Sequence, residues 1–143
     1  MDLLTLHNNA REASKGRIID ETLSMLKLRM LELNLLQLDY GLDTGGGKLR
    51  KYKSMRYAIK KNRMNSRPGL GNPDLKFTGA FWKAWRTDLR NHGVDIYSTD
   101  PKAEFLADKY MGIYGLTLES MQTLRAEALV IYLDRLRKEL GLS

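Results

Sequence analysis

The sequence predicts an α+β fold in which a small antiparallel β unit packs against a long N-terminal helix and a long C-terminal helix. Helix-forming residues with regular apolar spacing stand near each end of the chain, and a period-two alternation broken by a turn sequence stands between them. The 143 residues fit one domain, residues 1–143, which can bury about two-thirds of its unfolded surface. An extended basic arm bounded by glycine and proline, residues 41–73, is expected to be a flexible part of that domain.

A helix is expected over residues 17–37, where leucine, methionine, lysine, glutamate and arginine predominate. Its apolar residues follow the spacing of one helical face, at Ile19, Leu23, Leu26, Met30 and Leu33. Further leucines extend the apolar surface around the cylinder, at Leu28, Leu31, Leu35 and Leu38. Such a helix usually lies between two layers or at a subunit contact. A central core helix is favoured over a coiled coil, because no heptad pattern runs for three or four repeats.

The net positive charge of the chain is concentrated in the basic arm. It begins with Gly41 and the triplet Gly45-Gly46-Gly47, contains a short predicted helix over residues 55–61, and ends in a loop rich in proline and glycine. Between Asp43 and Asp74 there are nine basic residues and no acidic ones, and the net charge of the whole chain is +7, so the remainder sums to minus two. A local field of one sign indicates an anionic partner, either nucleic acid or an acidic protein surface.

Residues 74–98 are expected to form the β unit. Phe81, Trp85, Thr87 and Leu89 stand at even separations, and Asn91-His92-Gly93 is a turn sequence before a second alternating run. The competing interpretation is a helix over residues 80–90, because Phe81, Trp85 and Leu89 also lie four residues apart.

Two helices are expected in the C-terminal third. Asp100 as N-cap and Pro101 as the first helical residue predict a short helix to about Tyr110 that buries Phe105, Leu106 and Tyr110. Thr117 is expected to cap the last helix, and Gly141 to end it. The core stripe of that helix is predicted at Leu118, Met121, Leu124, Ala128, Tyr132, Leu136 and Leu140.

No pattern in the chain predicts catalysis, a cofactor or a metal. Residues 41–49 suggest a phosphate-binding loop, but Leu42 replaces its first glycine and Leu49 replaces the hydroxyl residue that holds magnesium. His7 and His92 lie far apart in the sequence, and neither belongs to a metal-binding spacing. His92, Asp95 and Ser98 are close in sequence, yet strand alternation directs Asp95 and Ser98 to opposite faces. The chain is therefore not expected to be an enzyme or to bind a small-molecule substrate.

The composition excludes some classes of protein. There is no cysteine, so disulfides and thiolate metal sites are excluded. The longest apolar runs are far short of the ~20 residues that cross a bilayer, and the first residues lack the basic and apolar regions of a secretory signal. No membrane contact is expected.

The order of three motifs carries a resemblance to a known class of protein. They are Gly41-Leu42-Asp43-Thr44-Gly45-Gly46, then Tyr57-Ala58-Ile59-Lys60-Lys61, then Leu75-Lys76-Phe77-Thr78-Gly79-Ala80-Phe81. In this order they resemble the virion-morphogenesis proteins of tailed phages, which are tail-completion or neck components. The chain is also similar to structural proteins of phages that infect Bacteroidetes, including crAss-like phages. This similarity rests on Arg63-Met64-Asn65, Pro68-Gly69-Leu70-Gly71-Asn72, Lys109-Tyr110 and Ile113-Tyr114-Gly115-Leu116-Thr117.

The resemblance implies a structural virion protein that forms a homo-oligomeric ring between the portal or connector and the tail. It also implies contacts with portal, connector or tail proteins, a non-specific contact with packaged DNA, and a location in the virion, with assembly in the host cytoplasm. The alternative function is a non-specific nucleic-acid-binding accessory protein that uses the basic residues 48–67. The candidate interaction residues for both are Lys48, Arg50, Lys51, Lys53, Arg56, Lys60, Lys61, Arg63, Arg67 and Trp82.

Overall fold

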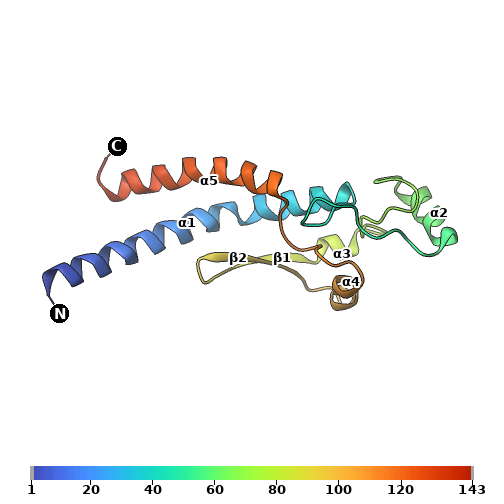
Figure 1. Ribbon diagram of the computed structural model, residues 1–143, viewed down its shortest axis with the longest axis horizontal. Coiled ribbons are helices and arrows are strands. Elements are labelled where there is room, and N and C mark those ends of the chain that lie inside the picture. Colours follow the sequence, from blue (N-terminus) through green and yellow to red (C-terminus); the bar gives the residue numbers. More distant parts are fainter. Residues whose placement is uncertain (1, 143) are drawn as a thin grey trace.

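A computed structural model describes residues 2–142 and confirms the α+β fold (Figure 1). The elements in chain order are α1 (Leu3–Asp39), α2 (Met55–Met64), α3 (Ala80–Lys83), β1 (Trp85–Arg90), β2 (Gly93–Ser98), α4 (Ala103–Lys109) and α5 (Leu118–Glu139). α1 is the central element, with α5 along one side and the β1–β2 hairpin along the other. The long helices run antiparallel, and α2 lies at the end of the molecule away from both termini (Figure 1).

Helix α1 is longer than predicted at its N-terminal end. The Asp2 carboxylate caps it by accepting a hydrogen bond of 2.7 Å from the Thr5 N–H. Residues 3–13 are exposed throughout, because they extend beyond the end of α5. The spacing of apolar residues predicted only the part of α1 that packs against other elements, because the exposed N-terminal turns have no apolar face. α1 ends before Gly41, whose φ of +69° favours glycine and whose added Cβ would lie only 2.8 Å from Cγ of Pro68.

Two hydrophobic clusters form the core. In the first, Leu26, Met30 and Leu33 of α1 pack with Leu124 of α5. The second joins the basic arm to the hairpin and the C-terminal segment, and contains Leu38, Leu49, Phe81, Trp85, Tyr110 and Ile113. The buried face of α1 therefore begins at Ile18 and Thr22, whereas the predicted Ile19 and Leu23 are half-buried.

Two buried amides of α1 hold the strap of residues 113–117 that leads into α5. Asn34 is fully buried, its Nδ2 donates to the Ile113 carbonyl at 2.8 Å, and its Oδ1 accepts from the Gly115 N–H at 2.8 Å. Gln37 repeats this arrangement one turn later, with the Gly115 carbonyl and the Thr117 N–H. The four hydrogen bonds satisfy buried backbone groups of a segment that belongs to no helix or strand.

The β unit is a two-stranded antiparallel hairpin, and it settles the ambiguity over residues 80–90. Neither interpretation covers the whole stretch, because α3 forms one helical turn and β1 follows directly. Asn91 and His92 form the two-residue loop with φ values of 50° and 57°, as a type I′ turn requires. The His92 Nδ1 lies 2.7 Å from Oδ1 of Asp20 on α1, and its ring packs over Gly16.

The caps of α5 agree with the sequence, but the start of α4 does not. Oγ1 of Thr117 accepts from the Ser120 N–H, and α5 ends in a Schellman arrangement around Gly141. Helix α4 instead begins after Lys102, because the Asp100 carboxylate accepts from the Lys102 N–H and leaves Pro101 in the preceding turn. Phe105 was predicted to be buried, yet it is 64% exposed. The predicted core stripe of α5 is also wrong in part, because Leu118, Met121 and Leu140 are exposed.

Candidate interaction surface

A buried ion pair anchors the basic arm to the rest of the molecule. Nζ of Lys61 lies 3.1 Å from Oδ1 of Asp74, and their side chains are only 3% and 0% exposed. The Lys61 ammonium also donates to the Arg67 carbonyl, while Asp74 accepts from the Asn65 side chain and the Lys76 N–H. Lys61 therefore lies inside the molecule, and its prediction as part of an interaction surface is corrected.

Burial has an electrostatic consequence at Asp74. It raises the pKa of the Asp74 carboxyl, although hydrogen bonds from the Lys76 N–H and the Lys61 ammonium oppose the shift. Because the folded carboxyl holds its proton more tightly than the unfolded one, ionisation of Asp74 costs stability as the pH rises through the folded pKa. The Lys61 charge and the surrounding donors offset this cost only while all of them stay in place.

The other eight basic residues of the arm are exposed, as a docking surface requires. Arg67 is paired with Asp39 at 2.8 Å and lies over the ring of Tyr40. Within residues 2–142, no carboxylate lies in ion-pair distance of the remaining seven, which are Lys48, Arg50, Lys51, Lys53, Arg56, Lys60 and Arg63. Their charge is therefore available to an anionic partner.

The glycine turn and Trp82 have structural roles of their own. The N–H groups of Gly45 and Gly47 donate to the Asp43 carboxylate, so the chain itself supplies the anion that a phosphate-binding loop would take from a ligand. Trp82 is half-buried, its Nε1 donates to the Asp74 carbonyl at 2.9 Å, and Lys76 lies 4.6 Å from its ring centroid. Trp82 thus supports the Lys61–Asp74 site from the hairpin side.

An aromatic groove lies beside the arm, between α2, the loop before α3, and α4. It encloses about 580 Å³, and its aromatic lining consists of Tyr52, Tyr57, Phe77, Phe81, Phe105 and Tyr110. Phe77 and Tyr57 stack with ring centroids 5.7 Å apart. Burial raises the pKa of Tyr57 and of Tyr110, so both hydroxyls stay protonated well above neutral pH.

Lysines border this groove and face its rings. Lys109 lies over both Phe105 and Tyr110, with Nζ 5.8 Å and 5.3 Å from the ring centroids, and Lys60 lies over Phe77 at 5.7 Å. Lys53 and Lys102 also line the groove. Flat apolar faces next to ammonium groups suit a ligand that is both aromatic and anionic. Sequence reasoning missed this groove, because its rings come from three segments that only the fold brings together.

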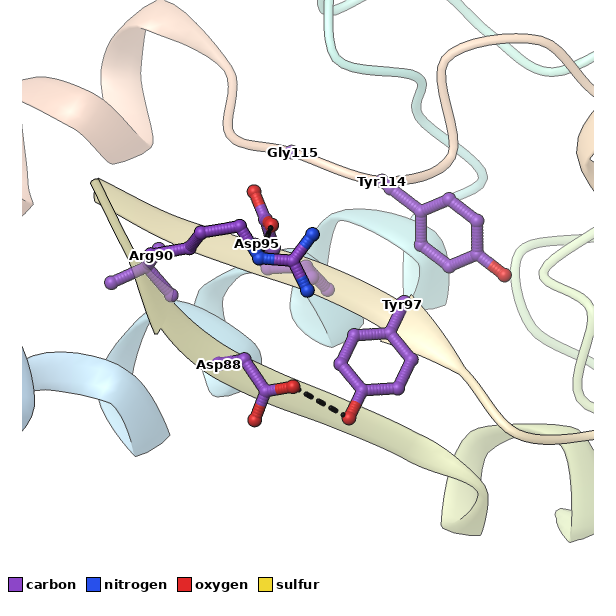
Figure 2. A pocket seen from close by; sticks show the side chains of 8 residues that line it. Asp88, Arg90, Asp95, Tyr97, Tyr114 and Gly115 are labelled. Atoms are coloured by element: carbon purple, nitrogen blue, oxygen red, sulfur yellow. Dashed lines mark hydrogen bonds and ion pairs between the residues drawn. The ribbon is translucent and has the colours of Figure 1, made fainter. Parts of the chain in front are cut away.

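A second hollow lies on the outer face of the hairpin and encloses about 710 Å³ (Figure 2). Asp88 and Asp95 stand directly opposite each other across the strands. The Tyr97 hydroxyl donates to Asp88 at 2.9 Å, and Arg90 Nε lies 3.4 Å from Asp95. The hydrogen bond to Asp88 raises the pKa of Tyr97. Both carboxylates already have partners within the hairpin. We therefore interpret this hollow as solvated polar surface and not as a binding site.

His92, Asp95 and Ser98 are close in sequence but do not form one cluster. Along β2 Asp95 is exposed and Ser98 is half-buried, in agreement with the predicted opposite faces, while His92 contacts Asp20. Among the described residues, no three histidine and carboxylate side chains gather closely enough to hold a metal ion. Over the same residues, no helix combines the length and the apolar character that a bilayer crossing requires.

No protein-family model matches the chain, and no curated protein or solved structure matches it either.

Proposed function

We propose that the chain is a structural subunit of a tailed-phage virion, placed at the neck or at the tail-completion position. In this role several copies form a ring between the portal or connector and the tail. The order of the three motifs over residues 41–81 suggests this class, and the role requires self-complementary surfaces rather than an active site.

The observation that carries the proposal is the amount of exposed surface. The chain exposes 9790 Å², whereas a compact monomer of 16.4 kDa exposes about 7,500 Å² by the usual scaling with mass. The exposed surface includes large apolar side chains on α5, such as Leu129 and Leu140. Large exposed apolar areas mark sites of protein–protein contact.

The basic arm supplies the second part of the proposed role. Its exposed cations suit docking on an acidic portal or tail subunit, where complementary charge raises the encounter rate and selects the register. The Lys61–Asp74 pair ties α2 to the loop before α3, so these charges stand on a defined scaffold. The same cations also suit a non-specific contact with packaged DNA.

Labelling of virions tests the placement. An antibody against the chain, applied to purified particles of the encoding phage, is expected to deposit immunogold at the junction of head and tail. The same antibody absorbed with purified chain serves as the control and is expected to leave particles unlabelled. Absence of the chain from purified virions by mass spectrometry, or label only on the capsid shell, would contradict the proposal.

The aromatic groove favours a second candidate function, non-specific binding of single-stranded nucleic acid. Bases stack on exposed rings while lysines neutralise phosphates, and the groove offers Phe105 together with Lys53, Lys102 and Lys109.

Truncation of one ring tests this second function. If bases stack on Phe105, the change Phe105→Ala is expected to weaken binding of a labelled oligonucleotide about 5- to 150-fold in fluorescence anisotropy, which corresponds to about 1–3 kcal/mol per stacked base. Phe105 is mostly exposed, so its loss leaves the core intact. Tyr97→Ala, an aromatic truncation outside the groove, is the matched control and is expected to bind like the native chain. Equal affinities for all three chains would exclude the groove as the binding site.

A further inference from the structure

Helix α5 is apolar on two opposite sides, and only one of them is covered. The inner side, with Leu124, Ala128 and Ile131, packs against α1. The outer seam consists of Ala126, Leu129, Leu133, Leu136 and Leu140. At 100° per residue, the centres of the two sides lie about 150° apart around the helix axis.

The outer seam is open to solvent. Leu129 is 57% exposed and Leu140 is 64% exposed, Leu133 and Ala126 are also exposed, and Leu136 is half-buried. α1 runs between α5 and the hairpin, so α5 is the outermost layer of the molecule on its side (Figure 1). Leu129 also lines a groove of about 440 Å³ between α5 and α1, with Ile19 and Leu23 among its other apolar residues.

The spacing of the seam indicates what covers it. Its five residues follow one another at separations of three, four, three and four, the pattern with which one helix packs along another. All five are aliphatic, so the complementary surface is an aliphatic helical seam with the same spacing. The chain itself carries such a seam, and symmetric self-association is the commonest way in which soluble proteins cover one.

The exposed area agrees with a second copy as the occupant. The chain exposes about 2,300 Å² more than a compact monomer of its mass, and a stable interface covers about 800 Å² on each partner. We therefore propose that the outer seam of α5 packs against the outer seam of a second copy of this chain. This contact rests on the proposed role of an assembling subunit and deepens it by naming the surface through which copies pair. Because a symmetric contact closes with two copies, a ring joins such pairs through a second surface.

Placing a charge on the seam tests the contact. The native chain is expected to have a mass in light scattering of at least twice the single-chain mass of 16.4 kDa. The substitution Leu133→Glu is expected to give the single-chain mass with unchanged helical circular dichroism, because an unpaired carboxylate is not tolerated in an apolar interface. Leu28→Glu, the same change at an exposed leucine on α1, is the matched control and is expected to keep the native mass.

A second variant keeps the test decisive if Leu133→Glu does not fold. Ala126 is exposed and helical, so Ala126→Glu removes little packing within the chain and is also expected to give the single-chain mass. A native chain of single-chain mass at tens of micromolar would overturn the contact. Seam variants that keep the native mass, or a Leu28→Glu control that loses it, would do the same.

A cross-link gives an independent measurement, because the chain has no cysteine. Leu133 lies at the middle of the seam, so its copies come close whether the two helices run parallel or antiparallel. Leu133→Cys with a short bismaleimide is expected to give covalent dimers, whereas Leu28→Cys is expected to stay uncross-linked. An oligomeric Leu133→Cys chain that does not cross-link would overturn seam-to-seam packing.

The seam contact and the virion role can fail separately. A native chain that is monomeric in solution but present in virions would contradict the seam contact alone. An oligomeric chain that is absent from virions would contradict the virion role alone.

Discussion

The substitution Asp74→Ala is expected to lower the free energy of unfolding by about 3–5 kcal/mol, the usual cost of removing one partner from a buried ion pair. It leaves the Lys61 ammonium without its counter-charge at a position that is 2% exposed. It also removes the acceptor of the Asn65 side chain and of the Lys76 N–H. Urea denaturation followed by far-ultraviolet circular dichroism measures the change.

The double substitution Lys61→Met with Asp74→Asn separates the ion pair from the loss of packing. It removes both charges while the asparagine oxygen still accepts from the Lys76 N–H, so it is expected to recover at least half of the loss. Asp108→Ala, the same change as Asp74→Ala at an exposed position on α4, is the matched control and is expected to stay within about 0.5 kcal/mol of the native chain. An Asp74→Ala chain as stable as this control would show that the pair contributes nothing.

The substitution Asn34→Leu is expected to lower the free energy of unfolding by about 2–6 kcal/mol, because two buried backbone groups lose their partners at about 1–3 kcal/mol each. These groups are the Ile113 carbonyl and the Gly115 N–H. Leucine has as many side-chain heavy atoms as asparagine and branches at the same carbon, so the substitution leaves no cavity. Denaturation in urea measures it, with the midpoint and the slope both recorded.

The matched control for Asn34→Leu stands on the same helix. Asn9 is exposed on α1, and Asn9→Leu is expected to change the stability by no more than about 0.5 kcal/mol. Limited proteolysis is expected to cut the strap of residues 113–117 faster in the Asn34→Leu chain than in the control, because the strap is tied to α1 through Asn34 and Gln37. Equal stability and equal cutting in both chains would mean that the amide does not anchor the strap.

Local sequence patterns predicted most of the helices and strands, but they did not predict contacts between residues that are distant in the sequence. Thr117 as a cap and Asn91-His92 as a turn depend on neighbours within a few residues, and both predictions are confirmed. Asn34 and Gln37 look like polar interruptions of a leucine-rich helix until the strap that they bind, about 80 residues later, lies beside them. The virion role and its partners stay predictions.

The sequence by itself determined the two long helices, the hairpin between them and the concentration of positive charge in residues 41–73, because periodicity, capping and charge are read from nearby residues. Only the tertiary structure decided that Lys61 leaves the charged surface to pair with Asp74, and that Phe105 joins Tyr57 and Phe77 around one groove. It also decided which side of α5 stays open. Burial depends on which distant segments pack together, and the residues next to a position in the sequence do not predict this.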